Sequence, residues 1–133
     1  MKTKLYWVCC GALGLSLTLA GCVRTVNDRT SLGVPLIKDR VEGRYDRSVD
    51  EIFTAAKKVV EKMGTLVNEG ILYNQTNTVK TVEGRVNQAN VWVRVEGIEP
   101  KLTLVVVQAR TKGGAADVDL AHYIDKEIAL NLK

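Results

Sequence analysis

Cysteine and histidine are scarce in this chain of 133 residues. It has three cysteines and one histidine, His122, and two of the cysteines, Cys9 and Cys10, lie in an apolar N-terminal segment. If that segment is removed, Cys22 is the only thiol left, so an intramolecular disulfide is excluded. Catalysis by a Cys/His pair lacks a free thiol, and His122 is the only histidine available for a Ser/His pair. Without a disulfide, the stability of the fold must come from an apolar core.

A basic stripe is missing as well. The formal net charge is +4, but the first 21 residues carry two of the 19 lysines and arginines and none of the 15 acidic residues, which leaves +2 for the rest. Positive and negative charges alternate along that remainder, whereas a nucleic-acid-binding domain needs clustered lysine and arginine. We therefore expect no nucleic-acid partner.

The N-terminal segment has the organisation of a signal peptide. Lys2 and Lys4 precede an apolar run of about 15 residues, which is shorter than the roughly 20 that a membrane-spanning helix needs. The run ends in Leu-Ala-Gly-Cys at positions 19–22, where the small residues admit a signal peptidase and the thiol can accept a diacylglyceryl group. The sequence predicts cleavage between Gly21 and Cys22 and lipidation of Cys22.

These features divide the chain into three predicted regions. Residues 1–21 are the lipoprotein signal peptide, residues 22–40 the lipidated cysteine and a tether, and residues 41–133 a single domain. The tether shows no sustained hydrophobic period, which is typical of a linker. Val23 stands where an inner-membrane retention signal usually places aspartate. In a host with two membranes, the periplasmic face of the outer membrane is therefore the expected location.

The domain begins with one strand followed by a helix. Alternation predicts the strand at 41–46. Ser48 and Glu51 form an S-x-x-E capping box, apolar residues follow at helical spacing, and Gly64 supplies the helix end. A second helix is expected from Ala116 or Asp117 to near the C-terminus.

Four strands are expected between the two helices, at about 65–73, 78–86, 90–96 and 102–110, with turn-forming residues between them. Gly84 interrupts the second of these strands, which suggests a bulge. Short turns force the four strands into an antiparallel meander. The predicted fold class is α+β, with a five-stranded antiparallel sheet, two helices on one face and the order β-α-β-β-β-β-α.

Several short motifs carry a resemblance to known proteins. They are Gly-Arg-Tyr at 43–45, the alanine pair at 55–56, Val-Gln-Ala-Arg at 107–110 and the glycine pair at 113–114. Through them, residues 41–132 resemble a small family of bacterial lipoproteins described only as a domain of unknown function. The resemblance implies no catalytic residue. The element order is also similar to the helix-grip domains of accessory lipoproteins of the outer-membrane β-barrel assembly machinery, although a fold does not determine function.

Trp92, Arg94 and Glu96 form the candidate interaction surface. They alternate with the valines of the strand at 90–96, so if those valines face the helices, Trp92 points outward. An outward tryptophan beside an arginine is a common composition for an interaction hot spot. Two alternatives remain open at this point. The strand register could be inverted, or Leu36 and Ile37 of the tether could cover the indole ring.

No metal or cofactor site is predicted. Asp119, His122 and Asp125 could share one helix face, but a metal site needs further ligands from other elements. We expect a non-enzymatic, membrane-anchored accessory lipoprotein with a protein partner at the cell envelope. The alternative is a module of helix-grip type that binds a small apolar ligand or a lipid.

Overall fold

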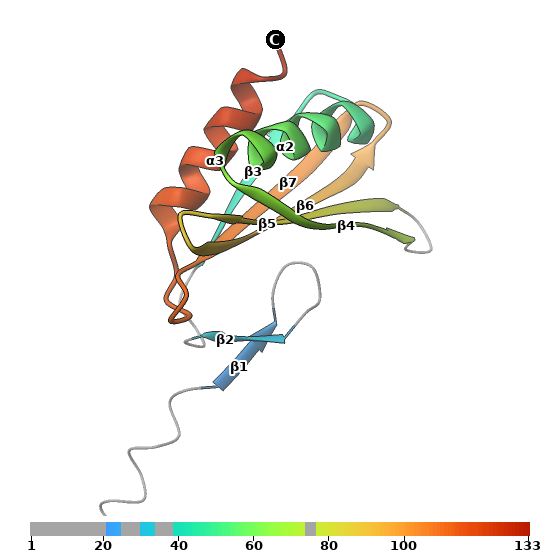
Figure 1. Ribbon diagram of the computed structural model, residues 1–133. Helices are drawn as coiled ribbons and strands as arrows, with labels where there is room; N and C mark the ends of the chain where they lie inside the picture. Colours follow the sequence, from blue (N-terminus) through green and yellow to red (C-terminus); the bar gives the residue numbers. More distant parts are fainter. Residues whose placement is uncertain (1–20, 25–29, 34–38, 74–76) are drawn as a thin grey trace, which may run out of the picture.

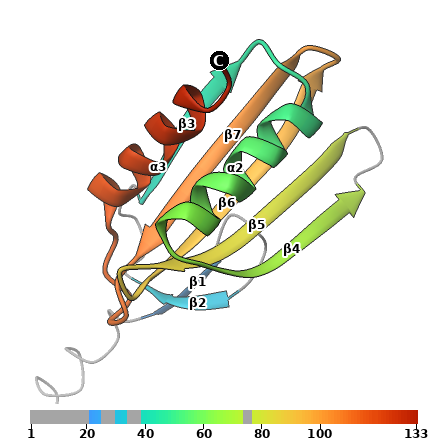
Figure 2. The same ribbon diagram turned by 45° about the horizontal axis from the view of Figure 1, so that its top comes forward.

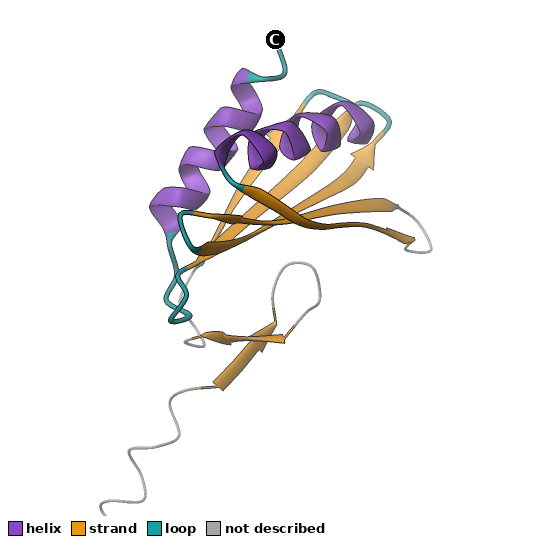
Figure 3. Ribbon diagram, viewed as in Figure 1, coloured by secondary structure: helices purple, strands orange, loops and turns teal. Residues whose placement is uncertain are grey.

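A computed structural model describes residues 21–24, 30–33, 39–73 and 77–133, which include the whole predicted domain except a short stretch between two strands. The elements in chain order are β1 (Gly21–Arg24), β2 (Thr30–Gly33), β3 (Arg40–Tyr45), α2 (Val49–Met63), β4 (Thr65–Tyr73), β5 (Thr78–Val86), β6 (Ala89–Glu99), β7 (Leu102–Arg110) and α3 (Val118–Leu130) (Figures 1 and 3). The predicted signal peptide up to residue 20 lies outside the described residues.

The domain is built on one antiparallel sheet with the strand order β3-β7-β6-β5-β4. β4 to β7 form the expected meander, and β3 completes the sheet by pairing with β7, for example Val41 with Val107. Both helices lie on the same face, α3 over β3 and β7 and α2 over the middle of the sheet (Figure 2). The predicted α+β fold class and element order are confirmed.

The capping signals determine where the helices begin. At α2 the Ser48 amide donates to Glu51 Oε2 at 3.1 Å and the Glu51 amide donates to Ser48 Oγ, which completes the capping box. The hydrogen bond from the Ser48 backbone, followed by the one from its hydroxyl, holds the pKa of the Glu51 carboxyl below its usual value. At α3 the Asp117 carboxylate accepts from the Leu120 amide at 3.1 Å. Both caps satisfy amide donors that have no partner within the helix.

The core lies between the helices and the sheet. Its fully buried side chains come from both layers: Ile52, Val59, Val60, Val82, Val91, Val93, Val95, Val105, Val107, Ile124 and Ile128. The strands supply almost only valine, whose β-branched side chain packs well on a pleated surface. Burial of this aliphatic layer provides the main driving force for folding, in agreement with the apolar core that the absence of a disulfide required.

The connections on either side of β6 differ from the sequence-based prediction. Residues 97–100 were expected to form a turn, but β6 continues to Glu99, with a register irregularity between Gly97 and Glu99. The preceding turn is also tighter than expected, because Asn87 and Gln88 have φ angles of 49° and 65° and Ala89 already pairs with Val86. Two consecutive left-handed residues form the two-residue connection whose twist suits an antiparallel hairpin.

The predicted tether contains a small hairpin. β1 pairs antiparallel with β2, from Gly21 opposite Gly33 to Arg24 opposite Thr30. Strands of four residues are too short to leave a clear alternation in the sequence, which is why no strand was expected here. The hairpin lies on the side of the sheet away from the helices (Figures 1 and 2). Leu36 and Ile37 lie outside the described residues, and a tether role for residues 22–40 stays a prediction.

Candidate functional site

The sheet has two different faces. One is covered by α2 and α3. The other, which we call the outer face, carries Arg40, Glu42 and Arg44 of β3, Leu104, Val106, Gln108 and Arg110 of β7, Trp92, Arg94 and Glu96 of β6, and Thr81 and Glu83 of β5. Val91, Val93 and Val95 belong to the helix-covered core, so the period of two sends Trp92 to the outer face. The predicted orientation of Trp92 is confirmed, and the inverted register is excluded.

Trp92 is nevertheless not solvent-exposed. Its side chain packs against Val106 and the partly buried Leu104, and the residue is only 9% exposed. Arg94 and Glu96 are partly exposed and pair with each other, with Arg94 Nη2 3.3 Å from Glu96 Oε2. The direction predicted for Trp92 is therefore confirmed, and of the alternatives left open the structure shows a covered indole. Contact of Trp92, Arg94 and Glu96 with a partner stays a prediction.

Fluorescence checks the burial of Trp92 directly. In a chain carrying Trp7→Phe, Trp92 is the only tryptophan, and we expect blue-shifted emission that resists quenching by iodide. Unfolding in urea should shift the emission to long wavelength and make the indole accessible to the quencher. Emission that is already red-shifted and readily quenched in the folded chain would contradict the position of Trp92.

The outer face buries polar side chains too. Thr81 and Glu83 of β5 and Gln108 and Arg110 of β7 are all nearly inaccessible to water. Long polar side chains on an open sheet face would stay hydrated, so their burial requires a covering layer. Among the described elements, β1 and β2 are those that lie on this side of the sheet (Figure 2). β1, which carries Cys22, therefore lies on the same side of the sheet as the outer face and not on the helix side.

A buried ion pair fixes the chain where it enters the domain. Asp39, just before β3, accepts a hydrogen bond from Gln108 Nε2 at 2.5 Å and forms an ion pair with the Arg110 guanidinium. Arg40 Nε approaches the other Asp39 oxygen at 3.5 Å. All three residues of the Asp39–Gln108–Arg110 cluster are buried. Paired and hydrogen-bonded burial of this kind makes a charge tolerable in the interior.

Sequence reasoning missed this cluster. Asp39 fell within the predicted tether, and Gln108 and Arg110 were noted only as part of the Val-Gln-Ala-Arg motif. The available signal was two long polar side chains at i and i+2 near the end of an otherwise apolar strand. Residues at i and i+2 of a strand point to the same face of the sheet. If that face is buried, both polar side chains need hydrogen-bond partners.

A second polar contact joins β3 to α3 on the helix side. The Tyr45 hydroxyl donates to Asp125 Oδ1 at 2.7 Å. Burial, reinforced by this hydrogen bond, raises the pKa of Tyr45 well above its ordinary range. Gly43 makes room for the pair, because a Cβ there would lie 2.9 Å from Asp125 Oδ1. The contact links strand and helix.

The helical spacing of Asp119, His122 and Asp125 does not produce a metal-binding group here. Asp125 is engaged by Tyr45, while Asp119 and His122 are exposed. Within residues 39–73 and 77–133, no three or more histidine, cysteine, aspartate or glutamate side chains are placed together to hold an ion.

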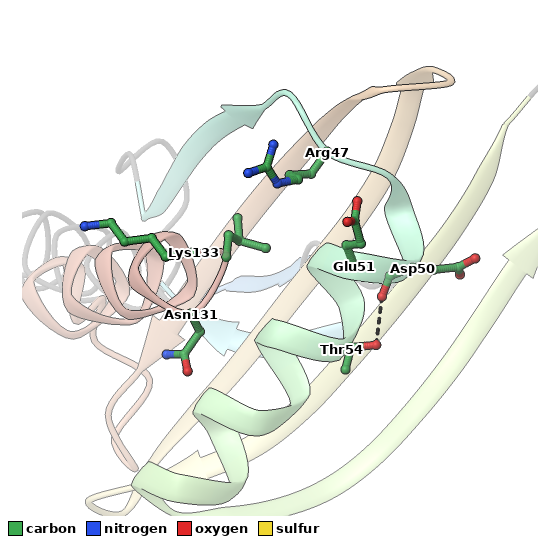
Figure 4. A pocket seen from close by; sticks show the side chains of 7 residues that line it. Arg47, Asp50, Glu51, Thr54, Asn131 and Lys133 are labelled. Atoms are coloured by element: carbon green, nitrogen blue, oxygen red, sulfur yellow. Dashed lines mark hydrogen bonds between the residues drawn. The ribbon is translucent and has the colours of Figure 1, made fainter.

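Two surface hollows of the domain do not gather catalytic groups. One of about 410 Å³ lies between the start of α2 and the end of α3, where Asp50 and Lys133 point away from each other (Figure 4). Its Glu51 is committed to the capping box, and its Thr54 hydroxyl donates to the Asp50 carbonyl at 2.8 Å. A hollow of about 460 Å³ between β3 and α3 is lined in part by Glu42 and His122. Neither combines a nucleophile with an oriented base.

The chain matches no known protein family, and no curated protein has a significantly similar sequence. The resemblance to the lipoprotein family of unknown function therefore stays a prediction. Among the described residues, no helix is long and apolar enough to cross a bilayer.

Proposed function

We propose that this chain is a membrane-anchored bacterial lipoprotein with a non-enzymatic accessory role, whose α+β domain binds a protein partner at the cell envelope. The observation that carries the proposal is the Leu-Ala-Gly-Cys junction at 19–22 after a charged and then apolar segment. Acylation of Cys22 with more than one chain would anchor the protein stably. Val23 after the cysteine favours the periplasmic face of an outer membrane.

The geometry of the outer face supports a defined orientation on the membrane. Cys22 lies in β1, on the side of the sheet away from the helices (Figure 1). The chain then enters the domain at Asp39, which is held to Arg110 at the end of β7. Because anchor and entry point share one side, we expect the helices to point away from the membrane, and the partner that the outer face meets to lie at the membrane surface.

A non-enzymatic role agrees with how the acidic groups are used. Asp39 is held by Arg110 and Gln108, Glu51 caps α2, and Asp125 accepts from Tyr45. Each of these three carboxylates has a structural partner, so none of the three is free to serve as an acid or base in hydrolysis.

The helix-grip alternative needs apolar space between helix and sheet. Val60 of α2 approaches β5 so closely that a Cβ on Gly84 would lie 2.2 Å from Val60 Cγ1. Ile52 and Ile124 are also fully buried between the layers. The space in which a helix-grip protein holds its ligand is here filled by side chains, so binding of a protein partner is the better-supported role.

Replacing Cys22 tests the anchor. Cys22→Ser should abolish metabolic labelling with palmitate and leave unprocessed precursor, because the serine hydroxyl does not accept the diacylglyceryl group. Cys9→Ser and Cys10→Ser are matched controls, since both cysteines lie in the predicted leader and their variants should be labelled and processed normally. Undiminished labelling of the Cys22→Ser chain would refute the anchor.

Crosslinking in cells tests the partner. A photo-crosslinking residue at position 96, on the same face of β6 as Trp92, should capture the same envelope protein reproducibly from the lipidated chain. The same residue at position 123, which is exposed on α3, provides the control for random collision. Equal products from both positions, or none from position 96, would argue against a partner at the outer face.

A further inference from the structure

The free edge of β4 is the most apolar exposed feature of the domain. β4 pairs only with β5, so its other edge is unpaired along the strand, and no described element lies beyond it (Figure 2). Four of the seven exposed large apolar side chains among the described residues belong to β4: Val67 at 61%, Ile71 at 49%, Leu72 at 41% and Tyr73 at 82% exposure. A long apolar edge is a template for pairing with another strand.

The opposite edge of the sheet is protected in the usual way. β3 is only six residues long and carries Arg40, Glu42 and Arg44 in alternation, and α3 packs close to it. Short length and charge are common devices that prevent edge pairing. β4 has neither, since its nine residues include a single charged one, Glu69. The contrast within one sheet singles out β4 as the edge available for pairing.

The composition of β4 favours a second copy of the same strand as its occupant. The Glu69 carboxylate is already paired with Lys57 Nζ at 2.9 Å, so two copies of β4 meet with little like-charge repulsion. An antiparallel pairing centred on Gly70 places Glu69 opposite Ile71 of the second copy and Asn68 opposite its Leu72. The two glutamates then face apolar side chains rather than each other, and the glycines at the centre let the backbones approach closely.

We propose that two copies of this chain associate through antiparallel pairing of their β4 strands about a two-fold axis at Gly70, which joins the two sheets into one. The axis is perpendicular to the sheet, so both helix layers lie on one side and both outer faces on the other. Under the proposed anchoring, the two β1 strands that carry Cys22 can then reach the same membrane. The pairing does not depend on the lipid, because it rests on β4 alone.

Engineered disulfides in the full chain test both the dimer and its register. Asn68 and Leu72 are exposed and four residues apart in one strand, about 13 Å at the usual rise, which is too far for a disulfide within one chain. The Asn68→Cys/Leu72→Cys double variant should give a covalent dimer on mild oxidation of membranes, because each cysteine faces its counterpart in the second copy. Neither single variant should do so. Absence of the dimer, equal dimer from the single variants, or a crosslink to a different protein would overturn the proposal.

Two further controls complete the test. Dimer formed by the parent chain, without added cysteines, would point to a free Cys22 thiol and so to failure of the proposed anchor rather than of the β4 pairing. Ile71→Asp places a carboxylate opposite Glu69 of the second copy and should weaken crosslinking of the double variant by about tenfold or more. Tyr123→Asp, at a 51% exposed apolar residue of α3, should leave crosslinking unchanged. Equal effects of the two aspartates would contradict pairing at β4.

Discussion

Replacing Arg110 with methionine is expected to lower the free energy of unfolding by about 3–5 kcal/mol, the usual cost of removing one partner of a buried ion pair. Asp39 is 5% exposed and has Arg110 and Gln108 as partners. Without the guanidinium, the Asp39 carboxylate has three possible fates. It stays buried with too few partners for its charge, it takes up a proton, or it moves into water together with the chain where it enters the domain. Urea denaturation followed by Trp92 fluorescence measures the loss as a lower midpoint.

Two comparisons show whether the loss of stability comes from the unpaired buried charge of Asp39 or simply from removing an arginine. Arg85→Met removes an exposed arginine from β5 of the same sheet and should change stability by less than about 0.5 kcal/mol. Asp39→Asn in the Arg110→Met background removes the orphaned charge and should recover part of the loss, since residues in direct contact are not additive. If Arg110→Met and Arg85→Met were equally mild, the buried ion pair would not stabilise the fold.

The sequence predicted those parts of the fold that depend on local signals. The capping box at Ser48 and Glu51 fixed the start of α2, and the alternation of the strand at 90–96 predicted which residues face the helices. The β4 and β5 bounds also agree with expectation, because polar turn residues separate two apolar runs. Features of this kind can be predicted from the sequence because they depend on residues that are only a few positions apart.

The sequence could not predict contacts between distant segments. Nothing local places β3 beside β7, and Asp39 meets Arg110 across 71 positions of the chain. Trp92 shows the same limit within one residue. Its direction follows from the period of two, but its burial depends on contacts with residues distant in the chain, such as Leu104 and Val106 of β7. The sequence therefore predicted the orientation of Trp92 but left its exposure open.

Gly84 illustrates how a local signal can have a non-local cause. The interruption of the β5 pattern suggested a bulge at this glycine. The register irregularity lies in the same part of the ladder but on the partner strand, in β4 between Leu66, which pairs with Gly84, and Asn68. Among the described glycines only Gly114 has a positive φ, so Gly84 is not required for its backbone conformation. It is required for space, since a Cβ there would lie 2.2 Å from Val60 Cγ1 and 3.0 Å from the Thr65 carbonyl oxygen.

Gly84→Ala is accordingly expected to destabilise the domain by about 1–3 kcal/mol, the usual range for overpacking a well-filled core. The added methyl group pushes α2 away from β5, because Val60 cannot turn aside within a buried helix face. Gly113→Ala is the matched control. Its Cβ would meet nothing closer than 4.0 Å, so the substitution should be neutral or slightly stabilising through the unfolded state.

A double-mutant cycle with Val60 distinguishes the clash from a general intolerance of β5. Val60→Ala removes the Cγ1 atom that the new methyl group would meet, at the cost of a small cavity. In that background Gly84→Ala should cost clearly less than in the parent chain, because the methyl group enters space that Val60 has left. Thermal unfolding of the four chains gives the coupling energy. A full and equal cost in both backgrounds would mean that the Thr65 carbonyl, rather than Val60, sets the limit on the size of residue 84, and that β4 rather than α2 requires the glycine.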